Sequence, residues 1–285
     1  MTSTCTIAIC DCSVGVTIHT PLPEADCHTA ILYLHGGGLL YGERDDLPAP
    51  YLHMFLDAGY TLFCLDYPLA PEASLSLIHQ AVLDGWAQLA HEQFPVYGIT
   101  RHFLFGRSAG AYLALLLAKH LRTEQILPPP VGILDFYGYY DMTDPFFSQP
   151  SVYYNRLPAV PRNFADRFLG GPPVTSGPKS QRFSLYVYAR QQGAWSALLG
   201  AADMADPAYS LSPADIAALP PLFITASSAD EDVPFRISKS LSRQAPSAVM
   251  KTVYYLEHDF DRDTNNPAGA EVYRACLAWM AGLNG

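Results

Sequence analysis

The feature of this sequence that most constrains its fold is a serine flanked by glycines, Gly-Arg-Ser-Ala-Gly at residues 106–110. It stands between an apolar run typical of a strand, residues 102–105, and a run typical of a helix, residues 111–121. In a strand–turn–helix of this kind the turn is sharp and lifts the serine hydroxyl clear of the sheet edge. Glycine is needed on both sides, because a side chain there would collide with the neighbouring strand or helix. Glycine and serine also occur together in ordinary turns, so the motif predicts this fold only if the rest of the chain agrees with it.

Apolar and polar segments alternate around this motif in a regular way. Between residues 29 and 137, short apolar runs of strand type alternate with longer runs of helical type, and the alternation resumes after residue 222. This rhythm predicts a mostly parallel sheet, doubly wound with helices on both faces, in one domain spanning residues 1–285. The expected strands are 6–9, 14–19, 29–34, 60–66, 102–105, 131–137, 222–226 and 250–256, and the expected helices are 48–57, 75–91, 111–121, 234–244 and 268–280.

The alternation breaks over residues 139–218, which are rich in aromatic residues and proline. An insertion of this length is too long for a plain loop, so we expect it to carry its own helices. The sequence therefore predicts a helical cap over the sheet.

The charge balance limits the partners of the chain. Seventeen basic and 27 acidic residues give a net charge of −10, which disfavours nucleic acids and anionic membranes and favours neutral or cationic substrates. The sequence has no apolar run of the roughly 20 residues that a membrane-spanning helix needs. The first residues lack the pattern of a signal peptide, so we expect a cytoplasmic protein.

The cysteines do not form a metal-binding pattern. Cys10 and Cys12 are separated by one residue instead of two, and no second pair completes a zinc site. We expect free thiols and no metal. The six cysteines are Cys5, Cys10, Cys12, Cys27, Cys64 and Cys276.

A glycine-rich run, His35 to Leu39, directly follows the expected strand that ends at Leu34. Its missing side chains leave backbone amides free to point into an open space, as the donors of an oxyanion hole do. A phosphate cradle is the alternative, but no lysine followed by serine or threonine completes a P-loop. The run therefore favours acyl-transfer chemistry.

A nucleophilic serine needs a base and an acid that orients the base. His258 lies in the last strand-to-helix connection, where the histidine of such a set belongs, although it could also be a solvated loop residue. Asp230 follows the strand 222–226 and is our choice of acid, with Asp232 in reserve. The alternative is that these acids merely enrich the start of the helix near Pro234. Calcium is disfavoured, because the acids lack EF-hand spacing.

Three blocks in this order resemble the hormone-sensitive-lipase-like esterases, which have the α/β-hydrolase fold. They are His-Gly-Gly-Gly at residues 35–38, Asp-Tyr-Pro-Leu-Ala-Pro-Glu at 66–72, and the serine motif at 106–110. The middle block carries Pro68 where the family usually has arginine, and Arg107 replaces an acid beside the serine. Arg107 could hold a substrate carboxylate, but we favour its pairing with a surface acid.

The resemblance implies a serine carboxylesterase. Ser108 would attack an acyl carbonyl, His258 would accept its proton, and Asp230 would orient the imidazole. By analogy with the family, the amides of Gly37, Gly38 and Ala109 would stabilise the oxyanion, and no cofactor would be required.

The substrate would be a small ester with a short-chain or aromatic acyl group. The candidate pocket residues also have a packing interpretation, as the core of the cap. The alternative functions are a small-peptide or amide hydrolase and a non-catalytic homologue that binds small molecules. A homodimer is possible in this fold. The candidate pocket residues are Leu39, Tyr41, Tyr186, Tyr188 and Trp195.

Overall fold

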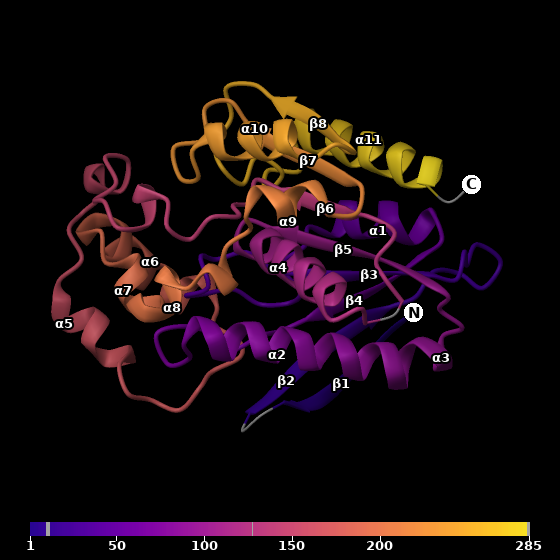
Figure 1. Ribbon diagram of the computed structural model, residues 1–285, viewed down its shortest axis with the longest axis horizontal. Helices are drawn as coiled ribbons and strands as arrows, with labels where there is room; N and C mark the ends of the chain where they lie inside the picture. The colour runs from indigo at the N-terminus through magenta and orange to yellow at the C-terminus, as the bar shows by residue number, and fades with distance from the viewer. Residues whose placement is uncertain (10–11, 127, 284–285) are drawn as a thin grey trace.

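Within the part of the chain that the structure describes, eight strands form one sheet in the order β1-β2-β4-β3-β5-β6-β7-β8. The computed structural model describes residues 1–9, 12–126 and 128–283 (Figure 1). The pairs β1–β2 and β2–β4 are antiparallel, and every later pair is parallel. The strands are β1 Thr2–Ile9, β2 Cys12–His19, β3 Thr29–Leu34, β4 Tyr60–Leu65, β5 Arg101–Arg107, β6 Ile133–Phe136, β7 Leu222–Ser227 and β8 Ala248–Val253.

Helices cover both faces of this sheet. The helices α2, α4 and α10 pack on one face, and α1 and α11 pack on the other (Figure 1). The sequence prediction of a mostly parallel, doubly wound sheet is therefore confirmed. The helices are α1 Ala49–Asp57, α2 Leu75–Gln88, α3 Phe94–Val96, α4 Ala109–Thr123, α5 Arg162–Ala165, α6 Lys179–Gln192, α7 Trp195–Leu199, α8 Ala201–Ala205, α9 Pro213–Ala217, α10 Phe235–Gln244 and α11 Pro267–Leu283.

The alternation of side chains along a strand builds the two cores. Along β3, Leu32 and Leu34 enter the core under α2 and α4, whereas Ile31 and Tyr33 enter the core under α1 and α11. Because successive side chains point to opposite faces, a strand covered on both sides must be apolar throughout. All six residues of β3 are accordingly buried.

Two expected elements extend three residues beyond their observed ends. The last strand ends at Val253, not at 256, because Tyr255 has a φ of 61° and the chain turns out of the ladder. The helix expected over 75–91 ends at Gln88, and a π-helical stretch, Leu89–Gln93, continues it toward α3. Cys10 and Asp11, which lie between the expected strands 6–9 and 14–19, are outside the described residues.

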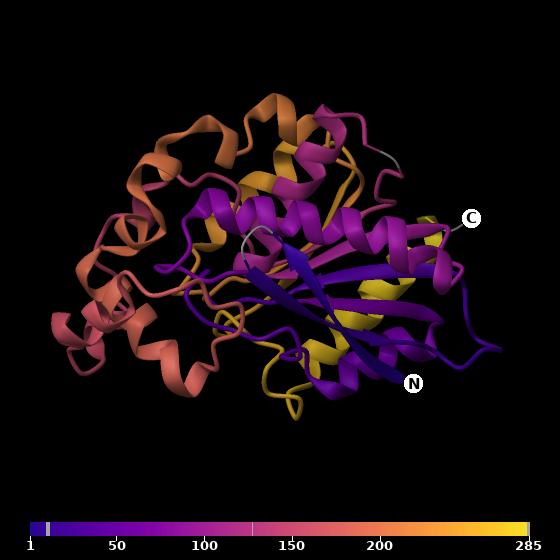
Figure 2. The same cartoon turned by 90° about the horizontal axis from the view of Figure 1, so that it is seen from below.

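Residues 139–218, called here the β6–β7 segment, contain α5 to α9. Figures 1 and 2 both place α5 to α8 together at one end of the sheet. Arg182 of α6 ties the segment to this end by donating to the carbonyl oxygens of Leu40 and Ala70 and to the carboxylate of Glu72. No helix among the described residues is long and apolar enough to span a membrane.

Candidate active site

Ser108 occupies the turn between β5 and α4 in a strained conformation, with φ of 53° and ψ of −116°. Such a backbone is costly for a residue with a side chain and persists only when its surroundings enforce it. A Cβ atom on Gly106 would collide with the backbone of Gly110, and one on Gly110 would collide with the carbonyl oxygen of Leu34. The two glycines therefore let the helix pack closely against the sheet and hold the serine at its edge.

Ser108, His258 and Asp230 form one chain of hydrogen bonds. His258 Nε2 lies 2.9 Å from Ser108 Oγ, and His258 Nδ1 lies 2.6 Å from Asp230 Oδ2. Asp230 lies in the loop after β7, and its Oδ1 accepts the amides of Asp232 and Val233, each at 2.9 Å. These amides fix the orientation of the carboxylate, which in turn fixes the imidazole.

The acidic surroundings of His258 govern its protonation. Burial lowers the pKa of His258, but the carboxylates of Asp230, Asp232 and Asp259 together outweigh burial and raise the pKa to about 9. The imidazolium form is therefore strongly favoured, and this is the form that would arise after His258 takes a proton from Ser108.

The glycine-rich run faces the serine from the end of β3. A Cβ atom on Gly36 would contact Ser108 Cβ at 3.5 Å, so the loop lies directly beside the serine. Gly37 and Gly38 have φ values of 104° and 60°, and their amides donate to none of the residues that the structure describes. Ala109 opens α4, where an N–H group has no acceptor within the helix. These amides have the freedom that oxyanion donors require.

Neighbouring side chains hold this loop. The Tyr67 hydroxyl donates to the carbonyl oxygen of His35 at 2.8 Å, and the two rings stack at 4.1 Å. Trp195 Nε1 donates to the carbonyl oxygen of Gly38 at 2.9 Å. The middle sequence block and the β6–β7 segment thus both fix the glycine loop.

Arg107, beside the serine, is buried in a polar network. Its Nη2 lies 2.8 Å from Asp261 Oδ1, its Nε donates to the Tyr137 hydroxyl at 2.8 Å, and its Nη1 lies 3.4 Å from Asp46. Arg107 does pair with acids, as we expected, but its nearer partner Asp261 is fully buried and only Asp46 is partly exposed. Sequence analysis missed Asp46, Tyr137 and Asp261; the available signal was a charge within an apolar strand, which needs a buried partner.

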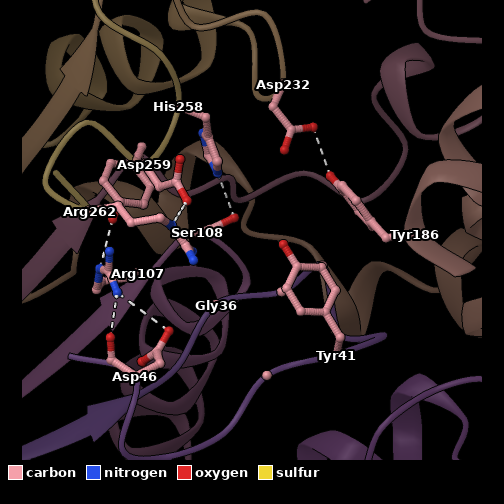
Figure 3. Close-up of a pocket in the computed structure, with 14 residues that line it drawn as sticks. Gly36, Tyr41, Asp46, Arg107, Ser108, Tyr186, Asp232, His258, Asp259 and Arg262 are labelled. Carbon is pink, nitrogen blue, oxygen red and sulfur yellow. Dashed lines mark hydrogen bonds and ion pairs between the residues drawn. The ribbon is translucent and has the colours of Figure 1, made fainter. Parts of the chain in front are cut away.

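A small cavity of about 40 Å³ adjoins Ser108 and His258. Figure 3 shows Tyr41, Tyr186 and Asp232 facing the space beside the serine. Of the expected pocket residues, Tyr41 and Tyr186 line this cavity. The structure places the other three elsewhere. Leu39 is buried in the core, Tyr188 packs against that core, and Trp195 packs among the rings of Tyr139, Phe146 and Phe147.

The reserve acid Asp232 forms no hydrogen bond or ion pair with His258 among the described residues. Instead it forms part of the cavity wall, where its two carboxylate oxygens accept hydrogen bonds from Tyr154 at 3.0 Å and Tyr186 at 2.8 Å. Arg190 forms an ion pair with Asp232, with its Nη2 3.7 Å from Asp232 Oδ1. Sequence analysis missed Tyr154 and Arg190, because they come from the β6–β7 segment and only the fold brings them here.

Comparison with known proteins places these features in a family. A family model described as the alpha/beta hydrolase fold matches residues 31–169. A curated relative, a non-reducing polyketide synthase from Penicillium rubens, is 38% identical to this chain over 141 residues. The chain spans only about 6% of the length of that protein. It is 33% identical over 126 residues to an ethyl acetate hydrolase from Pseudomonas putida, of which the match covers 38%.

Solved structures match over the whole chain. An alpha/beta hydrolase superfamily protein from Enterococcus faecalis is 34% identical, with 98% of each chain covered and a TM-score of 0.85. A Staphylococcus aureus protein of unknown function is 30% identical, with 99% of this chain and 100% of that chain covered and a TM-score of 0.88. An esterase from Pyrobaculum calidifontis shares the fold, with 18% identity, a TM-score of 0.74, and coverage of 98% of this chain and 83% of that chain. The chain therefore belongs to the α/β-hydrolase superfamily, whose fold its three sequence blocks predicted.

Proposed function

We propose that this protein is a serine hydrolase that cleaves small carboxylic esters through an acyl-enzyme. The observation that carries the proposal is the hydrogen-bonded chain from Ser108 Oγ through His258 to Asp230, at 2.9 Å and 2.6 Å. Nucleophile, base and orienting acid in hydrogen-bond reach are the arrangement that activates a serine.

In the first half of the reaction, the Ser108 oxygen attacks the carbonyl carbon while His258 takes the serine proton. The amides of Gly37, Gly38 and Ala109 hold the negative oxygen of the tetrahedral intermediate. His258 then gives its proton to the leaving alcohol oxygen as the ester carbon–oxygen bond breaks. Asp230 stabilises the charged imidazole throughout, which agrees with the raised pKa of His258.

In the second half, a water molecule takes the place of the alcohol. His258 removes its proton as the water oxygen attacks the acyl carbon, and the proton passes to Ser108 when the acid leaves. Every step is supplied by residues of this chain, with no metal or cofactor in the reaction as proposed.

The inner cavity supports a short acyl group. Its volume of about 40 Å³ holds no more than a few heavy atoms, and Tyr41 and Tyr186 form its wall. The relative described as an ethyl acetate hydrolase agrees with an acyl group of this size. We propose that the β6–β7 segment acts as the cap that closes this space, because its Tyr186 lines the cavity.

Hydrolysis of p-nitrophenyl acetate by the wild type and by Ser108→Ala tests the proposal. We expect kcat of Ser108→Ala to fall at least about a thousandfold, because the nucleophile is lost. Mass mapping after fluorophosphonate labelling should find the adduct on Ser108. Equal rates in the two proteins, or a label on another residue, would remove Ser108 from the mechanism.

A further inference from the structure

The glycine-rich run that faces Ser108 has an unusual backbone. Gly37, Gly38 and Leu39 all have positive φ values, of 104°, 60° and 62°. A leucine keeps such a conformation only where its surroundings enforce it. A glycine has no Cβ atom and takes either sign of φ with similar ease, so neither glycine resists a change of conformation by itself. Contacts from outside the run must therefore hold these peptides.

Those contacts are made by the carbonyl oxygens of the run. The amides of Gly37 and Gly38 donate to none of the described residues, whereas each carbonyl oxygen from residue 37 to residue 40 accepts a hydrogen bond. Because a trans peptide is planar, its C=O and N–H groups point in opposite directions, and a donor that holds the oxygen also aims the N–H. The donors are the amides of Leu40 and Tyr41 for residue 37, the Trp195 indole for residue 38, the Ala70 amide for residue 39 and the Arg182 guanidinium for residue 40.

Trp195 supplies the hydrogen bond to Gly38. Its Nε1 donates to the carbonyl oxygen of Gly38 at 2.9 Å, and among the described residues no other group donates to this oxygen. The peptide before Gly38 is held by the amides of Leu40 and Tyr41, which lie 3.0 and 3.1 Å from the carbonyl oxygen of Gly37. The backbone of Gly38 is thus fixed on both sides, and the peptide that follows it depends on Trp195.

The indole is itself held firmly. Trp195 is 1% exposed, and its ring centre lies 4.7 Å from that of Phe147 and 5.2 Å from that of Tyr186. Trp195 and Tyr186 also pack directly on Gly38, because a Cβ atom there would lie 3.2 Å from Trp195 Cζ2 and 2.3 Å from Tyr186 Cε2. A ring enclosed in this way keeps one orientation, so its N–H group is a donor of fixed direction.

We propose that Trp195 is a positioning residue for transition-state stabilisation, whose indole holds the backbone of Gly38 so that the Gly37 and Gly38 amides face the oxyanion. The inference rests on the proposed function. Trp195 is not part of the wall of the inner cavity, so it acts through the glycine-rich run and not on the substrate. Because α7 of the β6–β7 segment carries Trp195, the segment also helps to assemble the site that stabilises the oxyanion.

The substitution Trp195→Phe tests this role, because it removes the donor and keeps an aromatic ring. We expect kcat/KM for p-nitrophenyl acetate to fall about tenfold or more, since a displacement of about 1 Å in a catalytic group can cost about a hundredfold. The midpoint of the pH profile should remain that of the wild type, because the substitution leaves the hydrogen bonds of His258 in place.

Trp86→Phe is the matched control. Trp86 is 2% exposed, and its Nε1 donates to His102 Nε2 at 3.2 Å, near the end of β5 that lies away from Ser108. The control therefore makes the same chemical change and removes one buried hydrogen bond far from the site. It should leave kcat/KM unchanged. Urea unfolding of both variants measures what each hydrogen bond contributes to stability.

A trifluoromethyl ketone measures the oxyanion site directly. With 1,1,1-trifluoroacetone, the Ser108 oxygen bonds to the carbonyl carbon, the serine proton passes to His258, and the carbonyl π electrons move to the oxygen, which becomes the oxyanion. Such an adduct resembles the transition state, so its Ki should rise in Trp195→Phe by about the factor by which kcat/KM falls. The Ki should not change in Trp86→Phe.

The outcomes separate this inference from the proposed function. If Ser108→Ala keeps full activity, the proposed function fails and this inference fails with it. If Ser108→Ala is inactive but Trp195→Phe matches Trp86→Phe in both kcat/KM and Ki, only the role of Trp195 fails. A shifted pH midpoint in Trp195→Phe would also overturn that role, because the indole would then act on the base. If Trp195→Phe does not fold, Trp195→Met, whose flexible side chain fills irregular space, is measured in its place.

Discussion

Two arginines near the candidate site are buried to the same degree but are compensated in different ways. The side chains of Arg107 and Arg190 are each 4% exposed. Arg107 meets the carboxylates of Asp46 and Asp261 and the hydroxyl of Tyr137. Arg190 has one hydrogen bond, to the carbonyl oxygen of Asp232 at 3.0 Å, and its Nε and Nη1 find no partner among the described residues.

Aromatic rings replace the missing partners of Arg190. Its guanidinium lies 4.9 Å from the ring centre of Trp195 and 5.2 Å from that of Phe146, with Tyr154 and Tyr186 slightly farther away. Ring faces attract a cation but impose less direction than hydrogen bonds. The comparison suggests a division of roles in which Arg107 fixes backbone positions and Arg190 fills and orients a side-chain cluster.

Arg107 joins three segments of the site. It precedes Ser108, and its partners lie in the loop after the glycine-rich run, at Asp46, and in the loop that carries His258, at Asp261. We infer that Arg107 is a positioning residue, because it binds the segments that carry Ser108, the glycine-rich run and His258 while its own guanidinium hydrogen bonds go to protein groups.

Arg107→Met should therefore have the largest effect. It leaves Asp261 buried without its cation, and breaking a buried pair in this way lowers the free energy of unfolding by about 3–5 kcal/mol. Urea unfolding followed by circular dichroism measures the change. Arg107→Lys is the control that keeps the charge but loses the planar fork, and it should recover only part of the loss. A loss below about 1 kcal/mol for Arg107→Met would show that the network is not needed for stability.

The pH profile of activity tests how strongly the surrounding carboxylates hold a proton on His258. In the proposed mechanism His258 must be neutral to accept the serine proton. Its pKa is raised to about 9, with Asp230 as the main cause of the rise and Asp232 and Asp259 adding to it. Activity should therefore increase with pH up to about 9. Two units below the pKa the neutral fraction is about one hundredth, so kcat/KM at pH 7 should be about a hundredfold below its plateau.

Asp232→Asn sharpens this test. Removing that carboxylate should move the midpoint of the kcat/KM profile to lower pH, because Asp232 helps to raise the pKa of His258. Stopped assays with a neutral ester between pH 6 and 10 measure the shift. A profile already flat above pH 7 in the wild type would mean that the surrounding carboxylates do not hold the proton on His258.

Arg190→Met should be less harmful than Arg107→Met. The thioether of methionine packs well on aromatic rings, and the guanidinium gives up one hydrogen bond and its ring contacts, so we expect a loss of about 1–2 kcal/mol. Thermal unfolding of Arg190→Met beside Arg190→Lys, which keeps a cation among the rings, measures it. A loss as large as that of Arg107→Met would mean that pairing with Asp232 outweighs the rings.

The fold and the proximity of three side chains could be predicted from the sequence, because both depend on local patterns. Alternating apolar runs placed the strands, and the serine motif lies at the end of a strand in a parallel sheet. Since the carboxyl ends of parallel strands share one edge, Ser108, Asp230 and His258 had to come close together. The hydrogen-bond partners of the other side chains in the site could not be predicted in this way.

The missed residues depend on contacts between distant segments. Asp261 and Asp232 look alike in sequence, as acids in loops after strands, yet Arg107 binds one and two tyrosines bind the other. Trp195 was a candidate for the pocket or for the core of the cap; its ring packs in that core, and its Nε1 donates to the carbonyl oxygen of Gly38. Nothing in a local pattern says which ring of the β6–β7 segment faces the serine and which fills its core.

A third arginine, Arg236, gives the smallest expected effect and sets the baseline for the comparison. Its side chain is 60% exposed, and it holds both carboxylate oxygens of Asp144 at 2.6 and 2.7 Å. Despite this geometry, water and salt screen an exposed pair, so Arg236→Gln should cost about 0.2–1 kcal/mol, less still in 1 M NaCl. Urea unfolding at low and high salt measures both values. A loss that equals that of Arg190→Met, or that salt leaves unchanged, would mean that contact geometry outweighs burial in this protein, and the ranking from Arg107 to Arg236 would then need another cause.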